Sequence, residues 1–348
     1  SLGNPIHSRL NVIPPVSLRF ISDVVIMEPG TSRSVELEVK SARANSSGKI
    51  SLEAPHEDSS HAWKIEPRTH SFDFASVGQA AKFTFTVTAP SKSETATLRA
   101  SAEINGARYH SQRQEINYPH IPRQLLQAPA MLKVVSLQLK TRGHAVGYLP
   151  GAGDSLVENL QQMGYAVKTL DDANLTAKDL EGLDAVVIGV RAFNVREKIG
   201  SALPTLFQYI EKGGTVIAQY NRPDKLKAEK IAPFDLHISG DRVTDEKAAI
   251  TFLAPDSPVL NSPNTITKSD FDGWVQERGL YFANRWDPHF TPILSCNDAG
   301  EPPSQGALLI APYGKGHYVY TGLGFFRQLP AGVPGAYRLF ANLVSLGK

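Results

Sequence analysis

The sequence predicts two folded domains of different class, an all-β sandwich followed by an α/β domain built on a parallel sheet. Its 348 residues exceed the roughly 100 to 200 residues of a usual domain, which favours two domains. Apolar and polar residues alternate with a period of two from residue 16 to about residue 118, as in half-buried strands. Further along, apolar runs alternate with segments of helical spacing, which is typical of a parallel sheet covered by helices. We therefore place an all-β domain at residues 1–125 and an α/β domain at residues 126–348.

The first domain is predicted to be an immunoglobulin-like β-sandwich. Four segments alternate clearly, namely SVELEVKS, KISLEA, AKFTFTVTAP and TATLRASAEI. The turn-forming strings EPG, NSSG, SVG and NG separate the strands, and no convincing helix lies between them. The next segment, YPHIPRQLLQAPA at Tyr118–Ala130, contains three prolines and is interpreted as a linker or crossover.

The second domain is predicted to be a doubly wound sheet with helices on both faces. HAVGYLPGAGD is a strand that ends in a glycine-rich turn, SLVENLQQMG is a helix, and YAVKTL is the next strand. AVVIGV is apolar throughout, as expected of a central parallel strand, and it is followed by the helix LPTLFQYIEKGG and the strand TVIAQY. From about residue 233 the alternation gives way to Pro- and Asp-rich loops with short strands such as AAITFLA. GALLIAPYGKGHYVYTGLG then predicts two strands around a YGKG turn, and GAYRLFANLVSL a closing helix.

Charge and composition argue against several classes of function. The chain has 36 Lys+Arg and 34 Asp+Glu, a formal net charge of +2, and no run of five basic residues, so a nucleic-acid partner is not expected. No apolar stretch reaches the roughly 18 to 20 residues of a membrane span. The single cysteine, Cys296, excludes an internal disulfide and a Cys-rich zinc site. HEDSSH, at residues 56–61, has one residue too many for the HExxH zinc motif. We expect neither a metal nor a cofactor.

Several strings together resemble a known family: GYLPGAGD, VIGVRAFN, QYNRP, DFDGWVQERGLYF and YVYTGLGFFRQLPAGVPGAYRLFANL. Over most of residues 110–348 they resemble the C-terminal region of large bacterial PIG-L (LmbE-like) de-N-acetylases. In that family a zinc deacetylase domain precedes a β-sandwich, here similar to the NEW3 type, and a class I glutamine-amidotransferase-like domain. The resemblance implies a flavodoxin-like second domain and an extracytoplasmic location.

The chain departs from that family in one respect that bears on function. The family's His-Pro-Asp-Asp type motif and its later pair of zinc-binding histidines are absent from this sequence. The resemblance therefore implies that deacetylation belongs to a parent polypeptide, and that this chain is a non-catalytic accessory region. Its expected partners are a carbohydrate or the parent's own deacetylase domain.

Arg191 lies where such a domain places its nucleophile. In class I amidotransferase-like domains the nucleophile sits on a tight turn after a central strand, and GVRAFN matches that turn. A guanidinium is always protonated and cannot attack a carbonyl, so we expect no catalytic residue here. Its planar fork of donors suits a carboxylate or a phosphate; the alternative is an internal salt bridge with Glu197 or Asp154. Asn194, in the same turn, is a further candidate for ligand binding.

Other polar candidates follow strands at the same predicted edge of the sheet. Asp154 ends GAGD after the first parallel strand, either near a bound anion or as the N-cap of the next helix. Gln219 lies at the end of TVIAQY, the strand that follows AVVIGV along the chain, and Asn221 comes directly after it. Amides at this place suit a polyol ligand or ordinary loop capping. Arg327 lies between the last strand and the closing helix, as a ligand contact or as a brace for the loop.

Residues 270–287 contain two of the three tryptophans. Trp274, Glu277 and Arg278 stand there among carboxylates and further aromatic residues, a composition that suits a carbohydrate platform. The alternatives are that the aromatic rings fill the core and that Glu277 pairs with Arg278 across a loop.

Two enzymatic alternatives stay open. A hydrolase acting on a sugar or an amide would use carboxylates such as Asp154, Glu246 or Glu277 as general acid and base. An active cysteine amidotransferase would need Cys296 at the turn that Arg191 occupies. The residues after it, NDAGEPP, give no sign of the helix N-terminus that would lower the pKa of a thiol, so a buried and inert thiol is the alternative.

Overall fold

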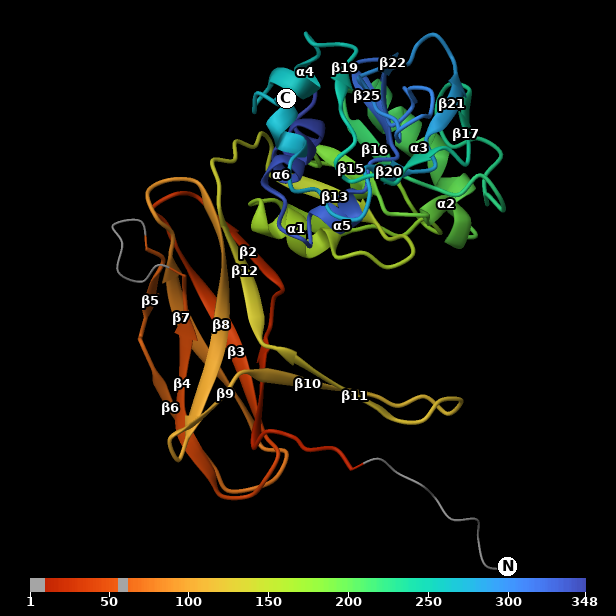
Figure 1. The fold of residues 1–348 in the computed structure, drawn as a ribbon. Helices are drawn as coiled ribbons and strands as arrows, with labels where there is room; N and C mark the ends of the chain where they lie inside the picture. The colour runs from red at the N-terminus through yellow and green to blue at the C-terminus, as the bar shows by residue number, and fades with distance from the viewer. Residues whose placement is uncertain (1–9, 56–61) are drawn as a thin grey trace, which may run out of the picture. The chain divides into compact units, whose positions relative to one another are not determined.

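The computed structural model describes residues 10–55 and 62–348; the HEDSSH segment at residues 56–61 lies outside the described residues. The chain divides into two compact units, Ser1–Gln138 and Leu139–Lys348 (Figure 1). This division falls later than the boundary after residue 125 that the sequence suggested. The reason is that strand β12 (Met131–Ser136) pairs with two strands of the first unit.

The first unit is a β-sandwich of two sheets. One has the order β1-β3-β7-β5, and the other the order β2-β12-β8-β4-β6, with β9 paired to β8. The strands of the first sheet are β1 (Val16–Phe20), β3 (Ser32–Ser41), β5 (Lys64–Glu66) and β7 (Ala80–Thr88). Besides β12, the second sheet contains β2 (Val24–Met27), β4 (Ser46–Glu53), β6 (His70–Phe74), β8 (Glu94–Ile104) and β9 (Ala107–Tyr109). The four segments with the clearest alternation in the sequence are β3, β4, β7 and β8, so the sandwich prediction is confirmed at this level.

Alternate side chains of these strands form the core between the two sheets. Leu37 and Phe85, from the first sheet, and Leu98, from the second, are completely buried in one hydrophobic cluster. Side chains on a strand point to opposite faces in turn, so an alternating sequence buries one set and leaves the other in solvent. The burial of β7 follows this rule towards its end, where Phe85 and Val87 are buried and Thr84 and Thr86 are exposed.

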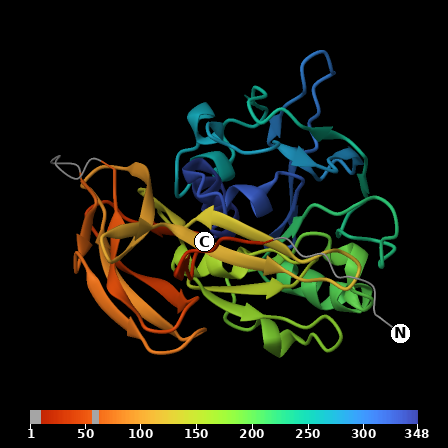
Figure 2. The same ribbon diagram turned by 60° about the horizontal axis from the view of Figure 1, so that its bottom comes forward.

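The segment interpreted as a linker contains a strand. β11 (Gln124–Pro129) pairs antiparallel with β10 (Ser111–Ile116) in a two-stranded ribbon. Figures 1 and 2 show this ribbon running out from the strands of the sandwich as a separate arm. Five of the six residues of β11 are exposed, so neither face of the ribbon requires an apolar stripe. The linker interpretation of Tyr118–Ala130 is therefore wrong for residues 124–129, which form β11. The strand was missed because a largely exposed ribbon does not need the alternation of apolar and polar residues that marks a half-buried strand.

The second unit is built on a seven-stranded sheet of order β14-β13-β15-β16-β25-β24-β22. The first five strands in this order are parallel to one another, and β24 and β22 continue the sheet antiparallel. The strands are β13 (Ala145–Leu149), β14 (Ala166–Thr169), β15 (Ala185–Ile188), β16 (Thr215–Gln219), β22 (Thr291–Pro292), β24 (Leu308–Tyr313) and β25 (Gly316–Thr321). Each strand expected in the sequence for this sheet is present, including the pair around the YGKG turn.

Helices connect the parallel strands. All four residues of β15 are completely buried, which requires cover on both faces of the sheet. Val186 and Ile188 share a hydrophobic cluster with Leu206 of α3, while α6 contacts β16 as well. The helices of this unit are α1 (Leu156–Gln162), η1 (Ala177–Leu180), α2 (Ala192–Val195), α3 (Ile199–Glu211), α4 (Pro258–Asn261), η2 (Lys268–Phe271), α5 (Phe325–Gln328) and α6 (Pro334–Val344). Among the described residues, no helix is both long enough and apolar enough to cross a membrane.

The region that the sequence marked as loops is held by three small antiparallel pairs. These are β17 (Leu236–Ile238) with β21 (Ala283–Trp286), β18 (Arg242–Val243) with β20 (Gly279–Leu280), and β19 (Thr251–Phe252) with β23 (Leu294–Ser295). Strands of two to four residues are too short to show a period, so only AAITFLA, which contains β19, was expected among them.

Candidate functional site

Arg191 occupies a sharp turn between β15 and α2. Its backbone adopts the left-handed conformation, φ 58° and ψ 20°, and α2 begins at the next residue. A residue with a side chain is uncommon there, and such strain persists only where the surrounding structure imposes it. Two hydrogen bonds hold the turn: the amide of Arg191 donates to the carbonyl of Tyr220 at 2.9 Å, and the amide of Val190 donates to Oδ2 of Asp154 at 3.2 Å. We call Gly189–Ala192 the elbow.

The Arg191 side chain has neither of the ion-pair partners considered from the sequence. Glu197 pairs with Lys227 at 2.7 Å. Asp154 accepts a hydrogen bond from the Tyr148 hydroxyl at 2.5 Å in addition to the Val190 amide. Nε of Arg191 is buried and has no hydrogen-bond partner among the described residues. The salt-bridge alternative for this arginine therefore does not hold.

Gln219 places a second unpaired donor at the same edge of the sheet. It is the last residue of β16, with a relative exposure of 1 %, and its Nε2 is buried without a partner. In the register of β15 and β16, Ile188 lies opposite Ala218, so Gln219 lies beside the first residue of the elbow. The sequence placed Gln219 and Arg191 together, but it gave no signal that both donors would be unpaired.

Aromatic rings and a second arginine flank the elbow. The ring of Tyr220 stacks on Tyr281, with centroids 5.6 Å apart, and lies 5.1 Å from Phe326. The guanidinium of Arg327 lies 4.7 Å from the centre of the Phe326 ring. Burial raises the pKa of Tyr220, and the positive charges of Arg191 and Arg327 oppose that rise. Both arginines are therefore within electrostatic reach of one phenol, which stays protonated at neutral pH. Phe326 is a neighbour that the sequence analysis missed.

Glu277 pairs with Arg327 and not with its neighbour Arg278. Oε1 of Glu277 accepts from Nε of Arg327 at 2.5 Å, and the carboxylate is nearly buried. The contact joins the loop before β20 to α5. Arg327 thus acts as a loop brace, which was one of its two interpretations, while its side chain remains 35 % exposed.

Trp274 and Arg278 belong to the core of the second unit. Trp274 is 3 % exposed, its Nε1 donates to the carbonyl of Asp270 at 3.0 Å, and its ring stacks on Phe271. Arg278 is 4 % exposed and donates to the carbonyls of Ala248 and Phe271. Both side chains are buried and their donors are paired inside the unit, which matches the alternative that the aromatic residues of this segment fill the core.

The remaining polar candidates connect the loops at the sheet edge. Nδ2 of Asn194 donates to the carbonyls of Arg222 and Asp224, and its Oδ1 accepts from the Arg222 amide. Asn221 is completely buried; its Oδ1 accepts from the Phe193 amide at 2.9 Å and its Nδ2 donates to the carbonyl of Gln219. For both asparagines the structure supports loop capping, the plainer of the two interpretations.

Asp154 also braces loops, although not as the N-cap residue. Ser155 occupies the N-cap position of α1, and Asp154 accepts from the amide of Leu156 at 3.3 Å. Its main contacts are with Tyr148 and the Val190 amide, so this carboxylate fixes the elbow. Burial and the bond to Asp154 raise the pKa of Tyr148.

Cys296 lies away from the elbow, in an isolated bridge with Ser304. The thiol is 1 % exposed, and burial raises its pKa to about 12. We expect iodoacetamide to alkylate the native protein at pH 8 on the order of 10³-fold more slowly than the urea-denatured chain, because the thiolate is the reactive form. The native rate should also rise steeply between pH 8 and pH 10. Equal rates in the native and denatured states would show an accessible, reactive thiol and contradict its burial.

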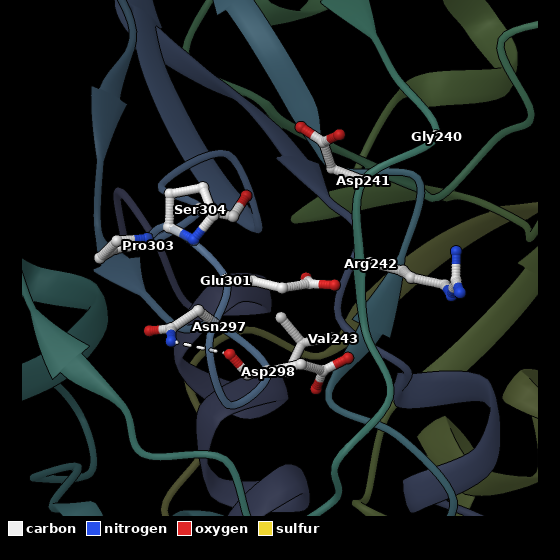
Figure 3. Close-up of a pocket in the computed structure, with 10 residues that line it drawn as sticks. Gly240, Asp241, Arg242, Val243, Asn297, Asp298, Glu301, Pro303 and Ser304 are labelled. Carbon is white, nitrogen blue, oxygen red and sulfur yellow. Dashed lines mark hydrogen bonds between the residues drawn. The ribbon is translucent and has the colours of Figure 1, made fainter.

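One pocket, of about 380 Å³, is lined by none of the residues predicted from the sequence. Figure 3 shows Gly240–Val243 forming one wall and Asn297, Asp298, Glu301 and Ser304 lying across from it. The Asp298 carboxylate already accepts three hydrogen bonds from Thr244 and Asp245. Burial raises its pKa, but these bonds outweigh burial and the net shift is downward. In the part of the chain that the structure describes, no group of three or more His, Cys, Asp or Glu could hold a metal ion.

A second pocket, of about 460 Å³, lies at β17 and β21. Trp286 lines it together with Asp235, His237, Arg285 and Asp287. Of the two tryptophans in residues 270–287, Trp286 is therefore the one that reaches a surface hollow, while Trp274 is buried.

Comparisons with known proteins leave the family open. No family model matches the chain, and no curated protein matches it. Among solved structures, Spo0M from Bacillus subtilis is 12 % identical, with 34 % of this chain and 50 % of that chain covered and a TM-score of 0.20; this chain thus spans half the length of that protein. The reelin-N domain of F-spondin is 17 % identical, with 38 % and 92 % covered and a TM-score of 0.22. A type I cohesin from Clostridium thermocellum is 12 % identical, with 35 % and 99 % covered and a TM-score of 0.19. At these TM-scores the likenesses support no argument about fold or function.

Proposed function

We propose that this chain is a non-catalytic accessory region whose α/β unit binds a ligand at the elbow. The observation that carries the proposal is the position of Arg191: an arginine stands on the strained turn between a central parallel strand and a helix. In enzymes of several classes a nucleophile occupies a turn of this kind. A permanently protonated guanidinium cannot attack a carbonyl, but it binds oxygen acceptors.

The unit is proposed to be flavodoxin-like and related to class I glutamine amidotransferases. The parallel strand order β14-β13-β15-β16-β25 supports this, because it follows the 2-1-3-4-5 order of that fold when the strands are numbered along the chain. In such sheets the ligand binds beyond the carboxyl ends of the strands, which is where Arg191 and Gln219 lie. The first unit is proposed to be an immunoglobulin-like, NEW3-type sandwich that acts as a spacer or docking surface.

The ligand is proposed to be a carbohydrate or the deacetylase domain of a parent PIG-L-type polypeptide acting outside the cytoplasm. Support comes from the motifs quoted above and from the two unpaired donors, which suit a partner rich in acceptor oxygens. The half-buried aromatic rings of Tyr281 and Phe326, which pack against Tyr220, add an apolar surface of the kind on which sugars stack.

The hydrolase alternative gains little support from the carboxylates. Asp154 is bonded to Tyr148 and to two backbone amides, and Glu246 accepts from the Gln276 amide at 2.6 Å. Glu277 is paired with Arg327. A general acid and a general base need freedom to exchange protons with a substrate between them, and each of these groups is already engaged.

Calorimetry with wild-type protein and the Arg191→Gly variant tests the proposal. Glycine accepts the left-handed conformation without strain, so this variant removes the guanidinium and should retain the fold. We expect N-acetylglucosamine oligomers, or a separately produced PIG-L-type deacetylase domain, to bind the wild type and to bind Arg191→Gly at least about tenfold more weakly. Arg242→Ala, at the pocket in Figure 3, is the matched control and should bind like the wild type.

Two outcomes would count against the proposal. The first is that neither class of partner binds the wild-type chain. The second is the release of a hydrolysis product from the same oligomers, with Glu277→Gln inactive, which would favour the carboxylate-dependent hydrolase.

A further inference from the structure

Two donors at the carboxyl ends of β15 and β16 are buried and unpaired. Nε of Arg191 and Nε2 of Gln219 have no hydrogen-bond partner among the described residues. Most buried polar atoms in folded proteins are paired, so each unpaired atom requires an explanation. Gln219 is 1 % exposed and Arg191 is partly buried, which keeps bulk solvent from satisfying these donors freely.

The two donors belong to one rigid piece of structure. The pairing of Ile188 with Ala218 fixes the register of the two strands. The hydrogen bond from the Arg191 amide to the carbonyl of Tyr220 then ties the elbow to the residue after Gln219. The backbones of Arg191 and Gln219 are therefore held next to each other at this edge of the sheet.

Nearby acceptors are already in use. The Asp154 carboxylate is bonded to Tyr148 and Val190, Oδ1 of Asn221 accepts from the Phe193 amide, and Glu277 is paired with Arg327. Among the described residues, no carboxylate lies within 4.0 Å of the Arg191 guanidinium, since none of the ion pairs includes it. None of these three side chains therefore supplies the acceptor that the two donors lack, which leaves a place for a water molecule or a ligand oxygen.

We infer that the elbow takes a ligand carboxylate, with one oxygen accepting from Nε of Arg191 and the other from Nε2 of Gln219. The inference rests on the proposed function, since it names the chemistry of the ligand that the elbow binds. A planar carboxylate has two oxygens and one charge, which matches two donors of which one is cationic. A phosphate carries more charge and is usually met by several cations or by a row of backbone amides, and the four-residue helix α2 offers no such row.

The variants that test this inference change one donor at a time. Arg191→Gly removes the cation and suits the backbone of the turn. Gln219→Glu keeps the shape of the side chain but replaces the donor with a negatively charged acceptor, so it should repel a carboxylate and should not repel a neutral sugar. Arg242→Ala again serves as the control.

The probes are matched pairs that differ only in the charged group. One pair is a galacturonic acid tetrasaccharide and its methyl ester; the other is a hexaglutamate peptide and its glutamine counterpart. By calorimetry we expect at least one acid to bind the wild type at least about tenfold more tightly than its neutral partner. The same preference should disappear in Arg191→Gly and in Gln219→Glu and persist in Arg242→Ala. The tetrasaccharide and the peptide distinguish a saccharide carboxylate from a protein carboxylate.

The outcomes separate this inference from the proposed function. Equal binding of acid and neutral probes, lost in Arg191→Gly, would overturn the carboxylate inference and leave a ligand site at the elbow. Tighter binding of any probe to Gln219→Glu would also overturn the carboxylate inference, because the ligand would then present a hydrogen-bond donor to this position and not an acceptor. Failure of all four probes, of the N-acetylglucosamine oligomers and of the deacetylase domain would remove the proposed function as well.

Discussion

Replacing Gly151 with alanine is expected to displace the elbow and to lower the free energy of unfolding of the second unit by about 3 kcal/mol. A Cβ atom at Gly151 would lie 2.0 Å from the carbonyl oxygen of Val190 and 2.7 Å from the carbonyl carbon of Gly189. Both obstacles are backbone atoms of the elbow, so a rotamer change cannot relieve the overlap. The same carbonyl of Val190 accepts from the Ala152 amide at 2.7 Å, and this bond must lengthen as well.

Urea unfolding of the full chain, followed by circular dichroism, measures this effect. The matched control is Gly240→Ala, because a Cβ atom there meets nothing within 4 Å and the glycine has no positive φ; its change should stay within about 0.5 kcal/mol. Ligand binding at the elbow should fall in Gly151→Ala even at temperatures where the variant is fully folded. A Gly151→Ala protein as stable as Gly240→Ala would contradict the close contact between the two loops.

Replacing Arg278 with methionine is expected to destabilise the second unit by about 3 kcal/mol. The guanidinium is buried against the stacked rings of Phe271 and Trp274, with its Cζ atom 5.8 and 5.7 Å from their centres. It satisfies the buried carbonyls of Ala248 and Phe271, and methionine would leave both without their donor. Burial lowers the pKa of Arg278, but an arginine remains charged at neutral pH.

This second prediction distinguishes a structural arginine from a ligand-binding one. Arg278→Lys should cost less than Arg278→Met, since an ammonium retains a donor but not the fork that reaches two carbonyls. Arg285→Met, at an exposed position, is the control and should change stability by no more than about 0.5 kcal/mol. If Arg278→Met is as stable as the control but binds ligand more weakly, the residue belongs to a binding site.

Periodicity in the sequence was sufficient to predict the longer strands and helices of both units. Strands such as β3 and β15 differ in pattern because one has a solvent face and the other is covered on both faces, and each pattern is local. β12 and the β10–β11 ribbon were missed for a different reason. Their positions depend on pairing with distant strands, and MLKVVS, the sequence of β12, does not reveal which sheet receives it.

The candidate site was predictable in position but not in detail. A strand, a turn and a helix around GVRAFN were enough to place Arg191, and the order of parallel strands placed Gln219 beside it. The sequence could not predict which side chains would be unpaired. Whether a donor is paired depends on the positions of all neighbouring acceptors in the folded chain. In the same way Trp274 and Trp286 both stand among charged residues in the sequence, and only tertiary packing buries the first and leaves the second at a surface pocket.

The placement of β12 has a consequence for how the chain matures as it is synthesised. This strand lies between β2 and β8, and its parallel partner β2 is near the other end of the unit. Parallel pairing between distant segments forms slowly, because a large loop must close first. The sandwich can therefore be completed only after residue 136 has left the ribosome. Until then the hydrogen-bonding edges of β2 and β8 that β12 later covers are open, and a nascent chain stalled before that point would be prone to aggregation.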